Sequence, residues 1–117
     1  MKHPERDEDY LDHIIESIDK IESYLNEYKK SGFYENTMVQ DAVIRNLEVV
    51  GEAVSQMSQA YKALHSHIPW RQISGMRNRL IHGYNAINMD IVWSTTEKVL
   101  PEFKKQISDL KKLGKQD

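Results

Sequence analysis

The chain has 117 residues, of which 39% are hydrophobic and 29% are charged, with a formal net charge of −2 and no cysteine. This length excludes two independent cores, and the absence of cysteine excludes disulfides and thiolate metal sites. The near-neutral charge excludes a general attraction to nucleic acid, so any such contact needs a local cluster of cations. We therefore expect one domain, residues 1–117, with frayed ends at about 1–6 and 114–117.

The sequence contains no apolar segment that approaches the length of about 18 residues needed for a membrane span. The charged N-terminal segment, residues 1–7, also lacks the pattern of a secretory signal. These two features predict a cytoplasmic protein that makes no membrane contact.

Two long amphipathic helices are predicted in the first half of the chain. Apolar residues recur at steps of three and four from residue 7 to about residue 30, which is the period of one helical face. The segment 30–33 breaks this pattern, and Asn36 or Thr37 can cap the helix that follows. Because the same period then continues with no proline, the second helix is predicted to run unbroken from about Thr37 to His65.

The second half of the chain predicts a short helix and a kinked one. Pro69 suits the first turn of the short helix, which Gly75 can interrupt and Gly83 should terminate. Asn88 or Asp90 can cap the last helix, which carries an internal proline.

Pro101 should kink or divide that last helix near residues 98–100 because proline lacks the backbone N–H that an inner turn requires. No segment of the sequence shows the sustained alternation of a strand. The predicted fold is therefore all-α, an antiparallel bundle of four to five helices with short connections.

Residues 75–84 concentrate the chemistry of the chain, because they hold two arginines, a histidine and a tyrosine. The arginine fork suits phosphate oxygens, and histidine titrates near neutrality. On an ideal helix Arg77 and His82 lie about 140° apart, so they would not share a face. They can still meet if the helix unwinds before Gly83, if a second copy completes the cleft, or both. Asn78 does share a face with His82 and can orient its imidazole or bind a ligand.

Two local clusters of cations are available for an anionic partner. The first cluster consists of Arg71, Arg77, Arg79 and His82, and the C-terminal one of Lys104, Lys105, Lys111, Lys112 and Lys115. The C-terminal cluster fits a solvated helix face, with cations favourably placed near the C-terminal end of the helix.

Residues 77–82 match the Arg-x4-His motif of the HEPN superfamily, and the surrounding chain resembles its HepT toxin family, found in HepT/MntA toxin–antitoxin systems. The resemblance extends over almost the whole chain, in segments that occur in the same order. The supporting segments are residues 44–53, 68–73 and 75–84, together with 92–93 and 100–101.

The resemblance implies a homodimeric HEPN bundle that acts as a metal-independent endoribonuclease, with no cofactor and with the two motif helices lining a cleft between the subunits. Arg77 and His82 are the implied catalytic pair. His82 suits proton transfer during attack of the ribose 2′-hydroxyl on the adjacent phosphorus, and Arg77 suits stabilisation of the transition state. Asn78, Arg79 and Arg71 are candidate supporting or RNA-binding residues, although for Arg79 a solvated surface position is the preferred interpretation.

The motif continues through His82 and Gly83 to Tyr84. The resemblance implies that a cognate MntA-like nucleotidyltransferase, the antitoxin of a type VII system, transfers AMP to Tyr84. An adenylyl group there would add negative charge and bulk beside Arg77 and His82, and would exclude RNA.

Other interpretations of the same residues stay open at this point. The chain could be a non-catalytic HEPN module that binds a nucleotide or serves as the partner of a nucleotidyltransferase, or a purely structural helical adaptor. His82 could simply place a cation at a helix C-terminus. Trp70 and Trp93 are expected to be packing anchors. The spacing of the histidines and carboxylates matches no recognised metal site, so no metal is expected.

Overall fold

The computed structural model of the protein describes residues 4–81 and 87–115. The described residues contain no strand, which confirms the predicted all-α fold. In chain order the helical elements are α1 (Pro4–Glu35), α2 (Thr37–Gln56), α3 (Gln59–Leu64), α4 (Trp70–Ile81), α5 (Met89–Ser94), the π-helical turn η1 (Thr95–Val99) and α6 (Leu100–Lys115).

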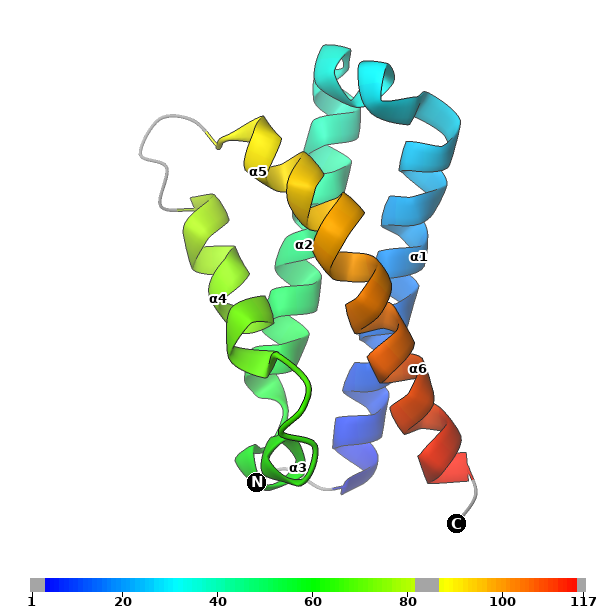
Figure 1. Cartoon of the computed structure of the whole chain (residues 1–117), viewed down its shortest axis with the longest axis vertical. Helices are drawn as coiled ribbons and strands as arrows, with labels where there is room; N and C mark the ends of the chain where they lie inside the picture. Colours follow the sequence, from blue (N-terminus) through cyan, green and yellow to red (C-terminus); the bar gives the residue numbers. More distant parts are fainter. Residues whose placement is uncertain (1–3, 82–86, 116–117) are drawn as a thin grey trace.

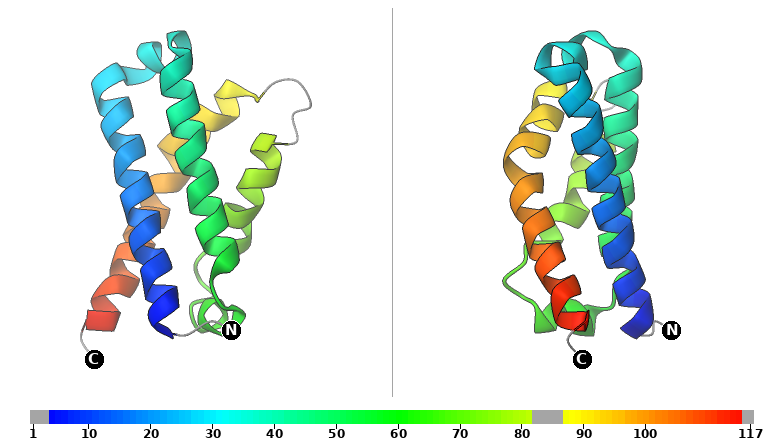
Figure 2. Two further views of the ribbon diagram at one scale, coloured as in Figure 1. Left: turned by 180° about the vertical axis from the view of Figure 1, so that it is seen from behind. Right: turned by 90° about the vertical axis from the view of Figure 1, so that its right-hand side faces the viewer.

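The long helices form an antiparallel bundle. α1 and α2 pack along each other and meet at the turn at the top of Figure 1. α4 lies against α2, while the continuous stretch α5–η1–α6 crosses the α1–α2 pair diagonally and packs along α1 (Figures 1 and 2). The first turns of α1, the short α3 and the end of α6 all lie at the opposite end of the bundle from that turn.

The predicted unbroken helix over residues 37–65 is wrong, because the chain leaves the helix at Met57 and starts again at α3. Ser58 caps α3 by accepting a hydrogen bond from the Tyr61 N–H at 3.2 Å. Its own N–H and hydroxyl both donate to the carboxylate of Asp7, each at 2.8 Å. Asp7 is only 3% exposed, so this contact ties the first turn of α1 to the corner between α2 and α3.

The turn between α1 and α2 follows its local signals closely. The helix breaks at Lys29, whose φ of 62° and ψ of −179° lie in a region that non-glycine residues rarely adopt, one residue before the predicted break. A Cβ on Gly32 would lie 2.8 Å from the Cβ of Tyr28, so this close approach requires glycine. Asn36 caps α2 as predicted, with its side-chain oxygen accepting from two backbone N–H groups.

The last helix is modified at its proline, also as predicted. Asn88 caps α5 by accepting from the backbone N–H groups of residues 90 and 91. Pro101 cannot donate to the preceding turn, and the Leu100 N–H bonds to the Thr95 carbonyl, five residues back. The expected kink near residues 98–100 is therefore accommodated as the π-helical turn η1, without separating α5 from α6.

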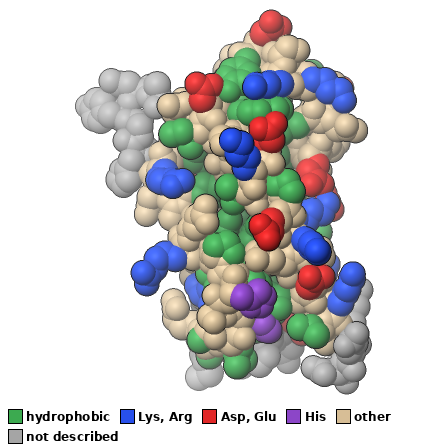
Figure 3. Space-filling model, viewed as in Figure 1, with side chains coloured by type: hydrophobic (Ala, Val, Ile, Leu, Met, Phe, Trp, Pro, Cys, Tyr) green, Lys and Arg blue, Asp and Glu red, His purple; other side chains and the backbone are tan. Residues whose placement is uncertain are grey.

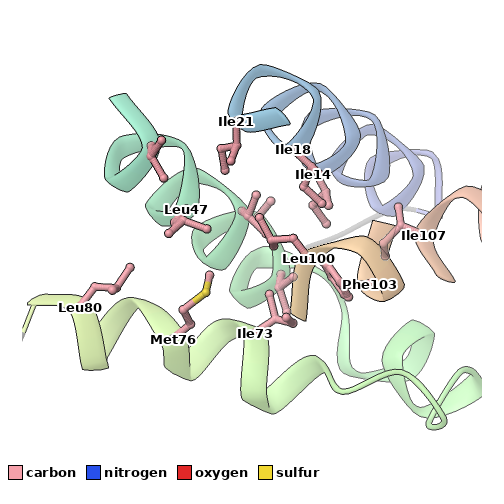
Figure 4. Packing of buried hydrophobic residues seen from close by; sticks show 14 of the residues in the cluster. Ile14, Ile18, Ile21, Leu47, Ile73, Met76, Leu80, Leu100, Phe103 and Ile107 are labelled. Carbon is pink, nitrogen blue, oxygen red and sulfur yellow. The ribbon is translucent and has the colours of Figure 1, made fainter. Parts of the chain in front are cut away.

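The core draws side chains from α1, α2, α4 and α6 (Figure 4). Burying each of these large apolar side chains contributes about 1.5–3 kcal/mol relative to leaving it exposed. The packing role predicted for Trp70 is confirmed, since it is 7% exposed, and Trp93 packs against the core while partly buried. Labelled members of the cluster are Ile14, Ile18, Ile21, Leu47, Ile73, Met76, Leu80, Leu100, Phe103 and Ile107.

Candidate functional site

The core fixes which face of α4 is available for function. Ile73, Met76 and Leu80 are at most 4% exposed and hold one side of α4 against the bundle. Arg71 and Asn78 are exposed. Because they are seven residues apart, they lie within about 20° of each other on the opposite side of the helix. Two of the predicted supporting residues therefore share one open face.

Gly75 lies between Arg71 and Asn78 on this face and does not interrupt α4, contrary to one expectation from the sequence. A Cβ built on Gly75 would meet nothing within 4 Å. The backbone of α4 is thus uncovered in the middle of its polar face, where a ligand or a second protein surface can approach closely.

The start of α4 is firmly anchored. The Pro69 carbonyl accepts the first helical hydrogen bond, from the Ile73 N–H at 3.1 Å. The indole N–H of Trp70 donates to the His65 carbonyl at 3.1 Å, and its ring meets Phe103 of α6 edge-on at 6.2 Å. Pro69 therefore acts at the helix start as the sequence predicts.

The motif residues divide between described and undescribed parts of the chain. Arg77 belongs to α4, and Arg79 is exposed on the same helix. His82, Gly83 and Tyr84 lie outside the described residues. The predictions that concern the cap at Gly83, the approach of His82 to Arg77, and Tyr84 therefore stay predictions.

Beyond residues 82–86 the chain is again anchored, by contacts that the sequence did not reveal. The Tyr34 hydroxyl, at the end of α1, donates to the Asp90 carboxylate of α5 at 2.5 Å. This hydrogen bond raises the pKa of the Tyr34 phenol above its usual value. The rings of Phe33 and Tyr34 also pack against Trp93. Since 56 residues separate Tyr34 from Asp90, no local pattern could have indicated this pair.

The described residues offer no group of three or more His, Cys, Asp or Glu side chains that could hold a metal ion. Among the described residues, no helix is both long and apolar enough to cross a membrane.

This all-α bundle, whose short fourth helix turns arginine, asparagine and an uncovered glycine outward, is consistent with a HEPN domain. The model of the ribonuclease HepT-like family matches residues 14–110, so the chain belongs to this family.

Curated relatives agree with this assignment. The chain is 38% identical over 104 residues to "Probable ribonuclease HepT" of Thermococcus cleftensis, a match that covers 89% of this chain and 94% of the relative. It is 34% identical over 101 residues to "Putative RNase TTE0752" of Caldanaerobacter subterraneus subsp. tengcongensis, covering 86% and 90%.

A third relative is longer than this chain. "Gamma-glutamylcyclotransferase and putative RNase MJ0434" of Methanocaldococcus jannaschii is 36% identical over 98 residues, which are 84% of this chain and only 44% of the relative. The match therefore spans less than half the length of that protein. No solved structure matches the chain.

Proposed function

We propose that this protein is the toxin of a type VII toxin–antitoxin pair and that it cleaves RNA in the cytoplasm without a metal ion. The observation that carries the proposal is the family match over residues 14–110, a range that includes the Arg77-x4-His82 motif. The uncovered polar face of the same helix supports a role in contacting a ligand.

The proposed reaction uses the ribose 2′-hydroxyl as the nucleophile. Its oxygen bonds to the adjacent phosphorus while the bond from phosphorus to the 5′-oxygen breaks, leaving a 2′,3′-cyclic phosphate and a 5′-hydroxyl. His82 takes the proton from the 2′-hydroxyl or gives one to the leaving oxygen, a role worth about 10²–10⁴-fold in enzymes. Arg77 stabilises the negative charge that develops on the phosphate oxygens.

We further propose that two copies of the protein form the active unit. Each copy contributes one α4, and the two motif segments face a shared cleft. The angular separation of Arg77 and His82 on an ideal helix supports this arrangement, because residues that do not share a face of one helix can still meet in a cleft that a second copy completes. Two histidines in one cleft would supply both the acid and the base.

Control of the toxin is proposed to act through Tyr84. A MntA-like nucleotidyltransferase would transfer AMP from ATP to its hydroxyl and release pyrophosphate, placing a phosphate next to the cationic motif. Repulsion between this phosphate and the RNA backbone, together with the bulk of the nucleotide, would prevent binding. Tyr84→Phe should leave cleavage intact and abolish the modification, which intact mass after incubation with the transferase and ATP would show. Persistent adenylylation of the variant at the same peptide would contradict this assignment.

The nuclease proposal is tested with protein whose mass shows that it is unmodified. Incubation with a defined RNA in excess chelator should give products with 2′,3′-cyclic phosphate ends, and His82→Ala should give none. If unmodified dimer cuts no RNA under these conditions, the proposal fails and a non-catalytic HEPN module becomes the better explanation.

A further inference from the structure

A surface pocket of about 450 Å³ lies where α3 meets the start of α4. It is separate from residues 77–82 along the chain, and no part of the proposed reaction uses it. None of the lining residues is acidic. They are Gln59, Lys62, Ala63, Ser66, Ile68, Pro69, Trp70, Arg71, Gln72 and Ser74.

The polar groups of the pocket suit an anionic ligand. Lys62 and Arg71 supply two positive charges, and the other polar lining side chains are neutral amides and hydroxyls that can donate hydrogen bonds. The ammonium of Lys62 donates to the Val54 carbonyl at 3.0 Å, which fixes its charge at the end of α2. Arg71 is exposed and forms no ion pair with another described residue, so its fork is available to a phosphate.

The pocket also continues the open face of α4. Arg71 and Ser74 line the pocket, and Asn78 lies one turn beyond Ser74 on the exposed side of the helix. The distance along the axis from Arg71 to Asn78 is about 10 Å, and Gly75 leaves the surface between them uncovered. Over α4 the charged side chains visible in Figure 3 are Lys and Arg, whereas both signs mix over α6.

We propose that this pocket binds a backbone phosphate of the RNA at some distance from the bond that is cleaved, with Arg71 as its main contact and Lys62 as a second cation. This inference rests on the proposed function, in which residues 77–82 act on the RNA at the bond that is cleaved. A single strand lying along α4 would pass over Gly75 and place a phosphate in the pocket. A strand too short to reach the pocket would lose this contact.

The test measures binding separately from cleavage. Single-stranded 2′-O-methyl RNA lacks the attacking hydroxyl, so fluorescence anisotropy reports affinity without turnover. Oligonucleotides of about 4 to 16 nucleotides span the usual range of single-strand site sizes. Wild type is compared with Arg71→Gln and with Lys112→Gln, a matched control that removes an exposed cation from α6.

For long oligonucleotides we expect Arg71→Gln to weaken binding roughly 3- to 10-fold at low salt. It should also reduce the slope of log affinity against log salt by about 0.7, the value for one contact to a single-strand phosphate. The shortest oligonucleotides should bind wild type and Arg71→Gln equally, and Lys112→Gln should match wild type throughout. Gln72→Glu gives a second test, because a carboxylate in the pocket should weaken the binding of long strands alone.

Equal affinity of Arg71→Gln and wild type for every length would overturn the inference, and so would an equal loss at every length. A pocket that serves an acidic protein partner would give the first of these results. The outcomes also separate this inference from the nuclease proposal. A length-dependent loss in a protein that cuts no RNA would refute only the nuclease, whereas normal cleavage with no dependence on Arg71 would refute only the pocket.

Discussion

α4 and α6 carry the same formal net charge of +3 but meet very different surroundings. α4 contains three arginines and no acidic residue, whereas α6 contains five lysines with Glu102 and Asp109. α6 packs along α1, which has ten acidic and four basic residues, while α4 packs against α2, which has three acidic and one basic. The cations of α6 therefore find partners within the fold much more readily than those of α4.

Ion pairs between α6 and α1 show the difference directly. Lys104 contacts Asp19 at 2.8 Å and Glu22 at 2.7 Å, and Lys111 contacts Asp12 at 2.7 Å. The predicted solvated lysine face of α6 is thus partly an ion-paired contact between α6 and α1. Arg71 and Arg79 of α4 form no ion pair with another described residue. The same net charge therefore stabilises the fold on α6, whereas on α4 it is available to bind a ligand.

The largest expected effect comes from removing a cation of α4 within the motif. Arg77→Ala should lower the cleavage rate by about 10²–10³-fold, the usual loss when one stabilising donor is removed from a transition state. Removing the exposed Lys105 of α6 should change the rate less than twofold. Single-turnover cleavage of one RNA by both variants gives the two rates. An equal loss of rate in both variants would contradict the proposed difference between the two helices.

A second prediction concerns the uncovered centre of the α4 face. Gly75→Ala should raise the free energy of unfolding by about 0.5–1 kcal/mol, because glycine inside a helix is unfavourable and the new methyl group meets nothing. Gly75→Leu should also fold, yet weaken RNA binding about tenfold, equivalent to 1.4 kcal/mol, by covering the path. Urea unfolding and anisotropy measure the two effects. Unchanged RNA affinity in Gly75→Leu would show that the face is not used.

Lys104 gives the converse prediction for α6. Lys104→Met should reduce the free energy of unfolding by roughly 0.5–1 kcal/mol, within the range for partly exposed ion pairs, and leave RNA affinity unchanged. Urea unfolding at neutral pH and low salt tests the first part. A clear loss of RNA affinity with unchanged stability would mean that α6, too, offers its charge to a ligand.

The smallest predicted effect also comes from Lys104, and it is a dependence of the free energy of unfolding on pH. Hydrogen bonds from Lys104 to Asp19 and then Glu22 raise its pKa above the ordinary lysine value of 10.5. A group whose pKa is raised in the folded state contributes its full stabilisation at pH values below its pKa in the unfolded chain. This stabilisation is lost as the pH rises through its pKa in the folded protein. The stability difference between wild type and Lys104→Met should therefore be constant to about pH 10 and shrink above it. A difference that grows above pH 10 would contradict this.

Local signals explain why much of the fold was predictable from the sequence. Asn36 and Asn88 cap their helices through backbone groups two and three residues away, and Pro101 acts on its own turn. The exposure of Arg71 and Asn78 likewise follows from the period of the apolar residues in α4. Each of these features depends on neighbours within about two helical turns.

Features that depend on distant residues were not predictable. The periodicity of α2 continues through residue 58, and the break there depends on Asp7, 51 residues away. The Tyr34–Asp90 contact and the ion pairs of Lys104 likewise join segments that only the folded chain brings together. The pocket beside Arg71 arises from the same break, because α3 exists as a separate helix only after it.

The most direct test of the contrast between α4 and α6 is to map RNA binding on the backbone amides by NMR. Titration with a long 2′-O-methyl RNA should shift the amides of residues 71–79 and of the pocket, and leave those of residues 104–112 in place. Shifts that gather on residues 104–112, with α4 unaffected, would contradict the account.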